Sequence, residues 1–196
     1  MARIPPKDSG AHTFRNLKVP FFTPLEAYYI MEAARSTDYG AALALMLFGG
    51  VKKEALVCEH CTPLSWENID FSARTIFISK ALNHGNPAFL IDCAPKNLWR
   101  WLEWERKEQG PIFPRSLREL DHFIEEQMER TVPVNALRDS FAIHHLALWK
   151  NLKTTARLLG YEGRLSILQR DCSDLTTREE AIEYFDIYPN GPDILY

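Results

Sequence analysis

The sequence predicts an α+β domain that is mostly α-helical and carries one small antiparallel β-hairpin or sheet. Several segments repeat apolar residues at helical spacing, and one of them places Leu137, Phe141, His145 and Trp149 on a single face. A shorter stretch near the middle of the chain alternates polar and apolar residues, which is typical of strands. The length of 196 residues is enough for one domain with its own core.

The N-terminal part begins with an irregular segment. Residues 1–21 contain prolines, a glycine and scattered basic residues without periodicity, so we expect an extended basic arm or linker, followed by the domain at residues 22–196. A helix should start at Thr23, because Thr23 can cap it, Pro24 suits its first position and Glu26 completes a capping box. Residues 39–48 predict a second helix that is buried, since it is apolar nearly all round.

The next segments predict a hairpin between short helices. Gly49-Gly50 ends the second helix, and a third short helix is expected over residues 51–57. Residues 74–78 alternate and are rich in branched and aromatic side chains, residues 83–86 read as a turn, and residues 88–91 read as the return strand.

The second half of the chain predicts helices throughout. An aromatic-rich helix is expected over residues 95–109, ended by Gly110-Pro111, and an amphipathic one over residues 117–129. The stripe from Leu137 belongs to a long helix, after which a second helix stops at Gly160. Residues 176–180 cap a final helix in which Ala181, Tyr184 and Phe185 are the apolar positions.

The charge distribution is uneven although the net charge is only −3. Residues 1–22 hold four Lys/Arg and one acid, residues 130–170 hold seven and two, and residues 171–196 hold one and seven. Such a pattern fits solvated helix faces, and it equally fits a phosphate-facing surface followed by an acidic tail.

The cysteines and the apolar runs limit the class of protein. Four cysteines do not suggest a disulfide scaffold, and the absence of an apolar leader makes cytoplasmic residence the expectation. Residues 41–48 form the longest apolar run, too short to span a bilayer, so no membrane association is expected.

The segment Cys58-Glu59-His60-Cys61 supplies at most three metal ligands, and Cys93 could add a fourth. Without a second paired motif we expect neither a metal nor a cofactor.

The segment 137–146, followed by Leu159-Gly160-Tyr161, resembles the second half of the catalytic domain of tyrosine recombinases, the phage-integrase family. That family has a His-x-x-Arg motif, a helical run, a Leu-Gly-His motif and then a tyrosine nucleophile. The same frame here reads Asn135-Ala136-Leu137-Arg138 and then Leu159-Gly160-Tyr161. The arginine is present, and both histidines are replaced.

Two further segments resemble the same family. Residues 48–55 are similar to its first arginine motif, with Lys52 at the position of the arginine, and residues 65–71 are similar to its Trp-Glu-x-Ile-Asp element. The family carries a catalytic lysine on a small hairpin, for which Lys80 is the candidate. Lys52 and Lys80 can also be read as ordinary surface lysines. The resemblance covers about residues 22–189 and implies a phage-integrase catalytic-domain fold.

The resemblance implies a chemistry that this chain has largely lost. The family cleaves DNA through a covalent phosphotyrosine, with fixed cations stabilising the transition state and proton donors in reach. Counting past Tyr161 to the nucleophile position reaches Arg170 and Asp171, and a carboxylate there would repel a phosphate. We therefore expect no cleavage by the family mechanism. The matching positions are Lys52, Lys80, Asn135, Arg138, Tyr161 and Asp171.

Three functions remain open from the sequence. The first is a catalytically degenerate recombinase-like protein that keeps binding to double-stranded DNA, in a role linked to recombination or integration. The second is an active breaking–rejoining enzyme with Tyr161 or Tyr184 as a displaced nucleophile. The third is a protein-interaction module that docks through its C-terminal helix, which could also form a homo-oligomer. The expected phosphate contacts are Lys52, Lys80, Arg138, Lys150, Lys153, Arg157, Arg164 and Arg170.

Overall fold

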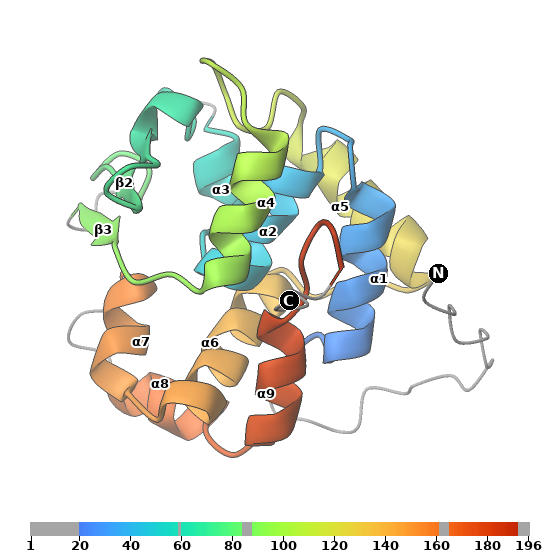
Figure 1. Cartoon of the computed structure of the whole chain (residues 1–196), viewed down its shortest axis with the longest axis vertical. Helices are drawn as coiled ribbons and strands as arrows, with labels where there is room; N and C mark the ends of the chain where they lie inside the picture. The colour runs from blue at the N-terminus through green and yellow to red at the C-terminus, as the bar shows by residue number, and fades with distance from the viewer. Residues whose placement is uncertain (1–19, 59, 84–87, 161–164, 192–196) are drawn as a thin grey trace.

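The computed structural model describes residues 20–58, 60–83, 88–160 and 165–191, apart from the side chain of Ile167. The described residues form a mostly helical α+β domain with a small antiparallel sheet (Figure 1). The elements are α1 Pro24–Ala34, α2 Gly40–Gly49, α3 Lys53–Leu56, the 3₁₀ helix η1 Trp66–Asn68, β1 Ile69–Asp70, β2 Thr75–Ile78, β3 Phe89–Ile91, α4 Lys96–Glu105, α5 Leu117–Met128, α6 Ala136–Trp149, α7 Leu152–Leu158, α8 Leu165–Cys172 and α9 Arg178–Phe185.

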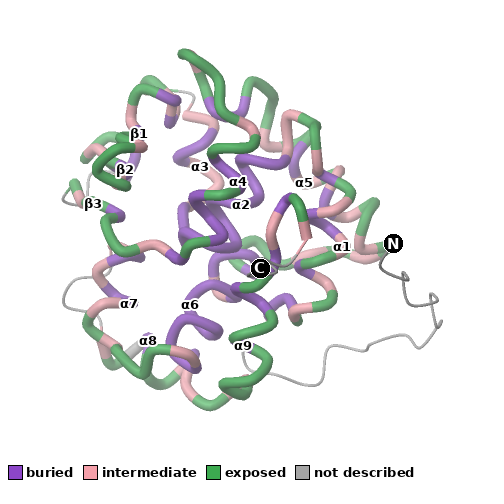
Figure 2. Tube along the Cα trace, in the orientation of Figure 1, coloured by how far each residue is buried: buried purple, intermediate pink, exposed green. Residues whose placement is uncertain are grey.

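Helix α2 forms the centre of the domain, as its apolar sequence predicts. All ten of its residues are buried, and it packs against α4, α6 and α1. Figure 2 shows buried positions along α2 and α6, whereas the outer turns of α4 and α9 are exposed. No helix in the described part of the chain combines the length and apolarity that crossing a membrane requires.

The sheet lies at one edge of the domain, next to α7 (Figure 1). Its strand order is β1-β2-β3 and both pairs are antiparallel. Ile76 is opposite Ile69 on one side and Ile91 on the other, and these side chains face the core. Phe77 and Leu90 are paired on the opposite face, where both are exposed. The sequence predicts β2 and β3 but not the two-residue β1.

The helix starts follow their local signals. Thr23 and Glu26 form the expected capping box on α1, and Thr177 with Glu180 forms the one on α9. Two predicted lengths are wrong. Helix α3 has four residues, and α4 ends at Glu105 rather than at Gln109.

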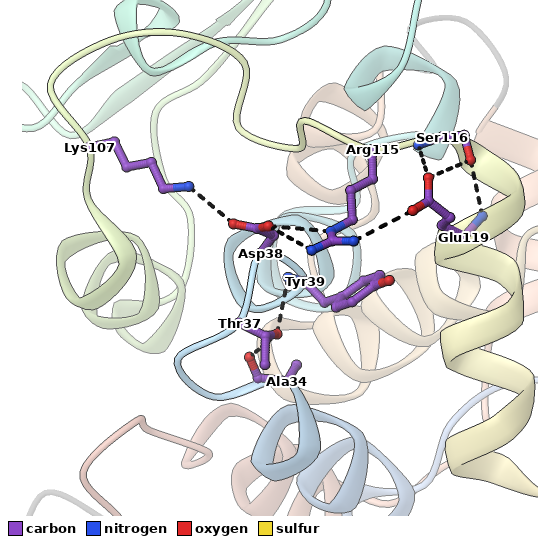
Figure 3. A network of polar contacts seen from close by, with 8 residues as sticks. All are labelled: Ala34, Thr37, Asp38, Tyr39, Lys107, Arg115, Ser116 and Glu119. Atoms are coloured by element: carbon purple, nitrogen blue, oxygen red, sulfur yellow. Dashed lines mark hydrogen bonds and ion pairs between the residues drawn. The ribbon is translucent and has the colours of Figure 1, made fainter.

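Long-range contacts of the following segment explain the early end of α4. The backbone N–H of Gly110 donates to the Glu67 carboxylate, at 3.2 Å from either oxygen, and the Gly110 carbonyl accepts from Trp66. Lys107 and Arg115 both contact Asp38, and Arg115 also reaches Glu119 at the start of α5 (Figure 3). These contacts draw residues 106–116 away from the helix axis and tie the α4–α5 connection to the α1–α2 turn.

Phe21 and Phe22, at the expected boundary between arm and domain, are both buried in the core. The Phe22 backbone N–H donates to Ser140 Oγ at 2.6 Å, and its carbonyl accepts from His144 Nε2 at 3.0 Å. His144 in turn stacks on Tyr184 of α9, with ring centroids 3.9 Å apart. Phe21 therefore packs with the core, and residues 1–19 of the predicted arm lie outside the described residues.

Candidate functional site

The candidate site is centred on Arg138, in the first turn of α6. Its side chain is buried, and one guanidinium nitrogen donates to the backbone carbonyl of Leu159, at the end of α7. Asn135 lies at the N-cap of the same helix, where it is exposed and its side chain does not cap the helix.

The segment that carries Lys52 lies against the same corner. Gly50 has φ +65°, and a Cβ there would lie 2.6 Å from Phe141 Cδ1 and 2.8 Å from Leu159 Cδ2. Only glycine allows the backbone to approach α6 and Leu159 so closely in this left-handed conformation. Lys52, two residues later, is the partly buried N-cap residue of α3. The packing of Gly50 therefore brings the Lys52 and Arg138 segments to one corner.

The sheet meets this corner through Gly160 and Arg157. Gly160 has φ +64°, and a Cβ there would lie 2.7 Å from Phe89 Cε1 of β3. Arg157 forms an ion pair with Asp92 at 2.7 Å, and its other terminal nitrogen lies 3.2 Å from the Cys93 sulfur. The Arg157 hydrogen bond holds the pKa of Asp92 below its ordinary value. Lys80 follows β2 of the same sheet and is exposed.

Asp139 follows Arg138 in α6, and the charges of Arg138 and of Asp171 in α8 both act on it. Burial raises the pKa of Asp139 from 3.8 to about 6; the positive charge of Arg138 opposes the rise, and the negative charge of Asp171 adds to it. Asp171, at the predicted nucleophile position, accepts from the guanidinium of Arg170 at 2.6 and 2.8 Å. The sequence analysis did not select Asp139. Its position directly after the motif arginine Arg138, in a helix expected to have a buried face, could have marked it as a site residue.

The remaining predicted residues lie in different places. Lys150 and Lys153 are exposed on either side of the start of α7. Tyr161 and Arg164 lie outside the described residues.

The structure contradicts a role for Tyr184 as a displaced nucleophile. Its ring is fully buried, and its hydroxyl donates to the Leu47 carbonyl at 2.7 Å. Burial also raises its pKa well above the ordinary value of a tyrosine. The hydroxyl therefore cannot reach a DNA phosphate in this fold.

The histidines of α6 are core residues and not site residues. His144 binds the Phe22 carbonyl, and His145 Nδ1 lies 2.7 Å from Thr155 Oγ1. Because the Thr155 hydroxyl donates to the Asn151 carbonyl, His145 donates its Nδ1 proton to Thr155. Burial lowers the pKa of each histidine to about 4, so both are neutral at pH 7.

Cys58 and Cys61 are joined by a disulfide, which the sequence did not lead us to expect. The two sulfurs are therefore bonded to each other rather than arranged as metal ligands. In the described part of the chain, no group of three His, Cys, Asp or Glu side chains is arranged to hold a metal ion.

No protein-family model and no curated protein matches this chain by sequence. Its structure resembles XerA recombinase (TM-score 0.61, 16% identity), covering 81% of this chain and 61% of that one. It also resembles the catalytic domain of bacteriophage HP1 integrase (0.57, 15%), covering 78% and 86%. A third similar structure is the Tn1549 transposon integrase in complex with a circular intermediate DNA (0.51, 14%), covering 81% and 62%. At these identities the likeness concerns the fold alone.

Proposed function

We propose that this chain, which has the fold of tyrosine recombinase catalytic domains, binds double-stranded DNA in a role linked to DNA recombination or integration, and that it does not cut DNA by the family mechanism. One observation carries the proposal. The corner at Leu159 holds Arg138, brings in the Lys52 segment through Gly50, and meets the sheet at β3, next to the strand β2 that Lys80 follows. These are the positions at which the resemblance expects phosphate contacts.

The proposed contacts differ in how readily they can bind a phosphate. Lys80, Lys150 and Lys153 are exposed, so a phosphate can approach them directly. Arg157 and Arg170 already contact Asp92 and Asp171, and these acids would compete with a phosphate for the two guanidinium groups. We therefore assign most of the binding energy to the lysines. Contacts of this kind give affinity without sequence preference.

The acids of α6 and α8 support the absence of cleavage. Asp171 stands where the resemblance expects the nucleophile, and a carboxylate would repel the phosphate it should attack. Asp139 adds a second acid next to Arg138. The missing donors remove stabilisation of the transition state, and the loss of one such donor costs on the order of a hundredfold in rate.

The test is duplex-DNA binding across a salt series. The double variant Lys150→Ala/Lys153→Ala should bind more weakly and lower the slope of log affinity against log salt by about 1 per lysine. Arg100→Ala/Arg118→Ala is the matched control, because it removes two exposed positive charges from α4 and α5 instead. Absence of binding by the intact chain at low salt would contradict the DNA-binding proposal, and equal slopes in both double variants would contradict the assignment of phosphate contacts to Lys150 and Lys153.

A nicked duplex tests the second half of the proposal. We expect no covalent protein–DNA adduct after denaturation, because the nucleophile position holds Asp171. An adduct that disappears when one tyrosine is changed would show that the chain is an active enzyme with a rearranged site. Tyr161→Phe is the informative variant, since Tyr184 is buried.

A further inference from the structure

The Cys58–Cys61 disulfide lies in the connection between α3 and η1, and its two Cα atoms are 5.3 Å apart. We propose that this pair is a thiol–disulfide exchange site, with a small-molecule or protein thiol as its co-substrate. The two cysteines are separated by two residues, a spacing that recurs in redox-active pairs. The proposal does not depend on DNA binding.

The fold does not need the bridge in order to hold the two ends of this connection together. The Leu64 N–H donates to the Ala55 carbonyl at 2.8 Å, and the Leu64 carbonyl accepts from Ile112 at 3.1 Å. Ala55 and Leu64 are both buried in the core. A ring closed by cysteines three positions apart also restricts little of the unfolded chain. Breaking the bridge therefore leaves the base of the connection in place, so both redox forms can stay folded.

The bridge lies at the margin of the core, against which both cysteines are packed. Cys58 and Cys61 are only partly buried, and His60, which precedes Cys61, is exposed. The pair therefore lies in a partly exposed segment, which a thiol from solvent can approach.

The two other cysteines are poor competitors for this exchange. Cys172 is buried, and burial raises the pKa of its thiol to about 12, so it forms almost no thiolate at neutral pH. Cys93 is exposed, but partial burial and its contact with Asp92 raise the pKa of its thiol above the ordinary value. Exchange should therefore remain within the Cys58–Cys61 pair.

The reaction balances as an ordinary exchange. An incoming thiolate attacks one of the two sulfurs, forms a mixed disulfide and releases the other cysteine as a thiolate, which takes up a proton. A second thiol then attacks the mixed disulfide and releases the remaining cysteine. Overall, two thiols are oxidised to one disulfide, and the Cys58–Cys61 bridge is reduced to two thiols. The reverse reaction closes the bridge.

The test equilibrates the whole chain in glutathione buffers of stepped thiol-to-disulfide ratio, followed by acid quenching, alkylation and intact mass measurement. The Cys93→Ser variant is used alongside, because it removes the exposed competing thiol. We expect a reversible step in which Cys58 and Cys61 gain two alkyl groups together, while circular dichroism shows that the fold is retained. Cys58→Ser should lose this paired step and leave Cys61 to form a mixed disulfide with glutathione.

Two results would overturn the proposal. In the first, the bridge resists every glutathione ratio and is reduced only after unfolding, which would make it a structural disulfide. In the second, the two thiols stay reduced even in oxidised glutathione, which would mean that the pair does not close under these conditions.

Discussion

Arg138 donates a hydrogen bond to the carbonyl of Leu159, 21 residues later in the chain. This contact joins the first turn of α6 to the end of α7, just before the left-handed Gly160. It therefore brings the arginine motif and the Leu-Gly motif into contact. From the sequence alone, only the order of these two motifs along the chain is known. The same carbonyl belongs to the residue against which Gly50 packs. One corner thus holds three segments that are distant in the sequence.

Gly50→Ala should destabilise the protein strongly. A Cβ at this position meets Phe141 and Leu159 inside 3 Å, and φ +65° is unfavourable for a residue with a side chain. Overpacking and backbone strain together should cost about 2 to 5 kcal/mol in the free energy of unfolding. Urea unfolding of the variant and the parent measures this difference.

Gly110→Ala is the matched control for that substitution. Gly110 also has positive φ, at +95°, but an added Cβ would meet nothing within 4 Å. Only backbone strain remains, so we expect a loss of about 1 to 2 kcal/mol. Equal losses for the two variants would contradict the close approach of Gly50 to α6.

Asp139→Asn should stabilise the protein at neutral pH. The pKa of Asp139 is raised from 3.8 to about 6 in the folded state, so its negative charge opposes folding. That cost is fully present above pH 6, declines as the pH falls from 6 to 3.8, and is absent below that. The free energy of unfolding of the variant should therefore exceed that of the parent by about 1 to 3 kcal/mol at pH 7. Urea midpoints measured from pH 7 to pH 4 should converge at the acid end; a difference that persists at pH 4 would refute this origin.

The buried histidines should act in the opposite direction. Each has its pKa lowered from 6.5 to about 4, so the neutral form is favoured by folding. Their contribution is fully present above pH 6.5 and is lost as the pH falls through 6.5 to 4, by up to about 3 kcal/mol for each. In the parent, Asp139 offsets part of this loss over the same pH range.

The fall in stability with falling pH that is due to the histidines should become measurable once Asp139 is replaced by a neutral residue. In the Asp139→Asn background, stability should fall more steeply between pH 6.5 and 4 than it does in the parent. Adding His145→Gln should remove about half of that fall, because a glutamine can still bind Thr155 but does not titrate in this range. An acid slope that is identical with and without His145 would show that the ring is not buried in its neutral form.

Much of the fold follows from local signals in the sequence. The capping boxes at Thr23 and Thr177 and the stop at Gly160 depend on neighbouring residues only, and the structure contains all three. The stripe that begins at Leu137 predicted one buried face of α6, but the helix is buried nearly all round, and Trp149 at the end of the stripe is nearly half exposed. Periodicity and capping are properties of a single segment, so they could be predicted without knowing what the segment packs against.

Features that depend on distant partners could not be predicted. The end of α4 is set by the binding of Gly110 to Glu67, 43 residues earlier, and Arg157 meets Asp92 across 65 residues. Strand β1 has only two residues and forms because β2 lies beside it.

Helix α8 was not predicted, for another reason. Leu165, Leu168 and Cys172 stand at helical spacing, but the residue before Leu165 is Arg164, so the sequence has no capping residue there to mark a helix start as Thr177 does for α9.

Tyr184→Phe should affect stability and leave any reaction with DNA unchanged. The variant loses the hydrogen bond from the buried hydroxyl to the Leu47 carbonyl, and we expect a cost of about 1 to 2 kcal/mol in the free energy of unfolding. Tyr28→Phe is the control, since this tyrosine of α1 is exposed and its change should cost less than about 0.5 kcal/mol. Neither variant should alter the salt dependence of DNA binding. The Tyr184 hydroxyl is enclosed by α2, α6 and α9, and Tyr28 is not among the proposed phosphate contacts. A DNA adduct present in the parent and absent only in Tyr184→Phe would require α9 to leave its place on α6, and would overturn the assignment of Tyr184 to the core.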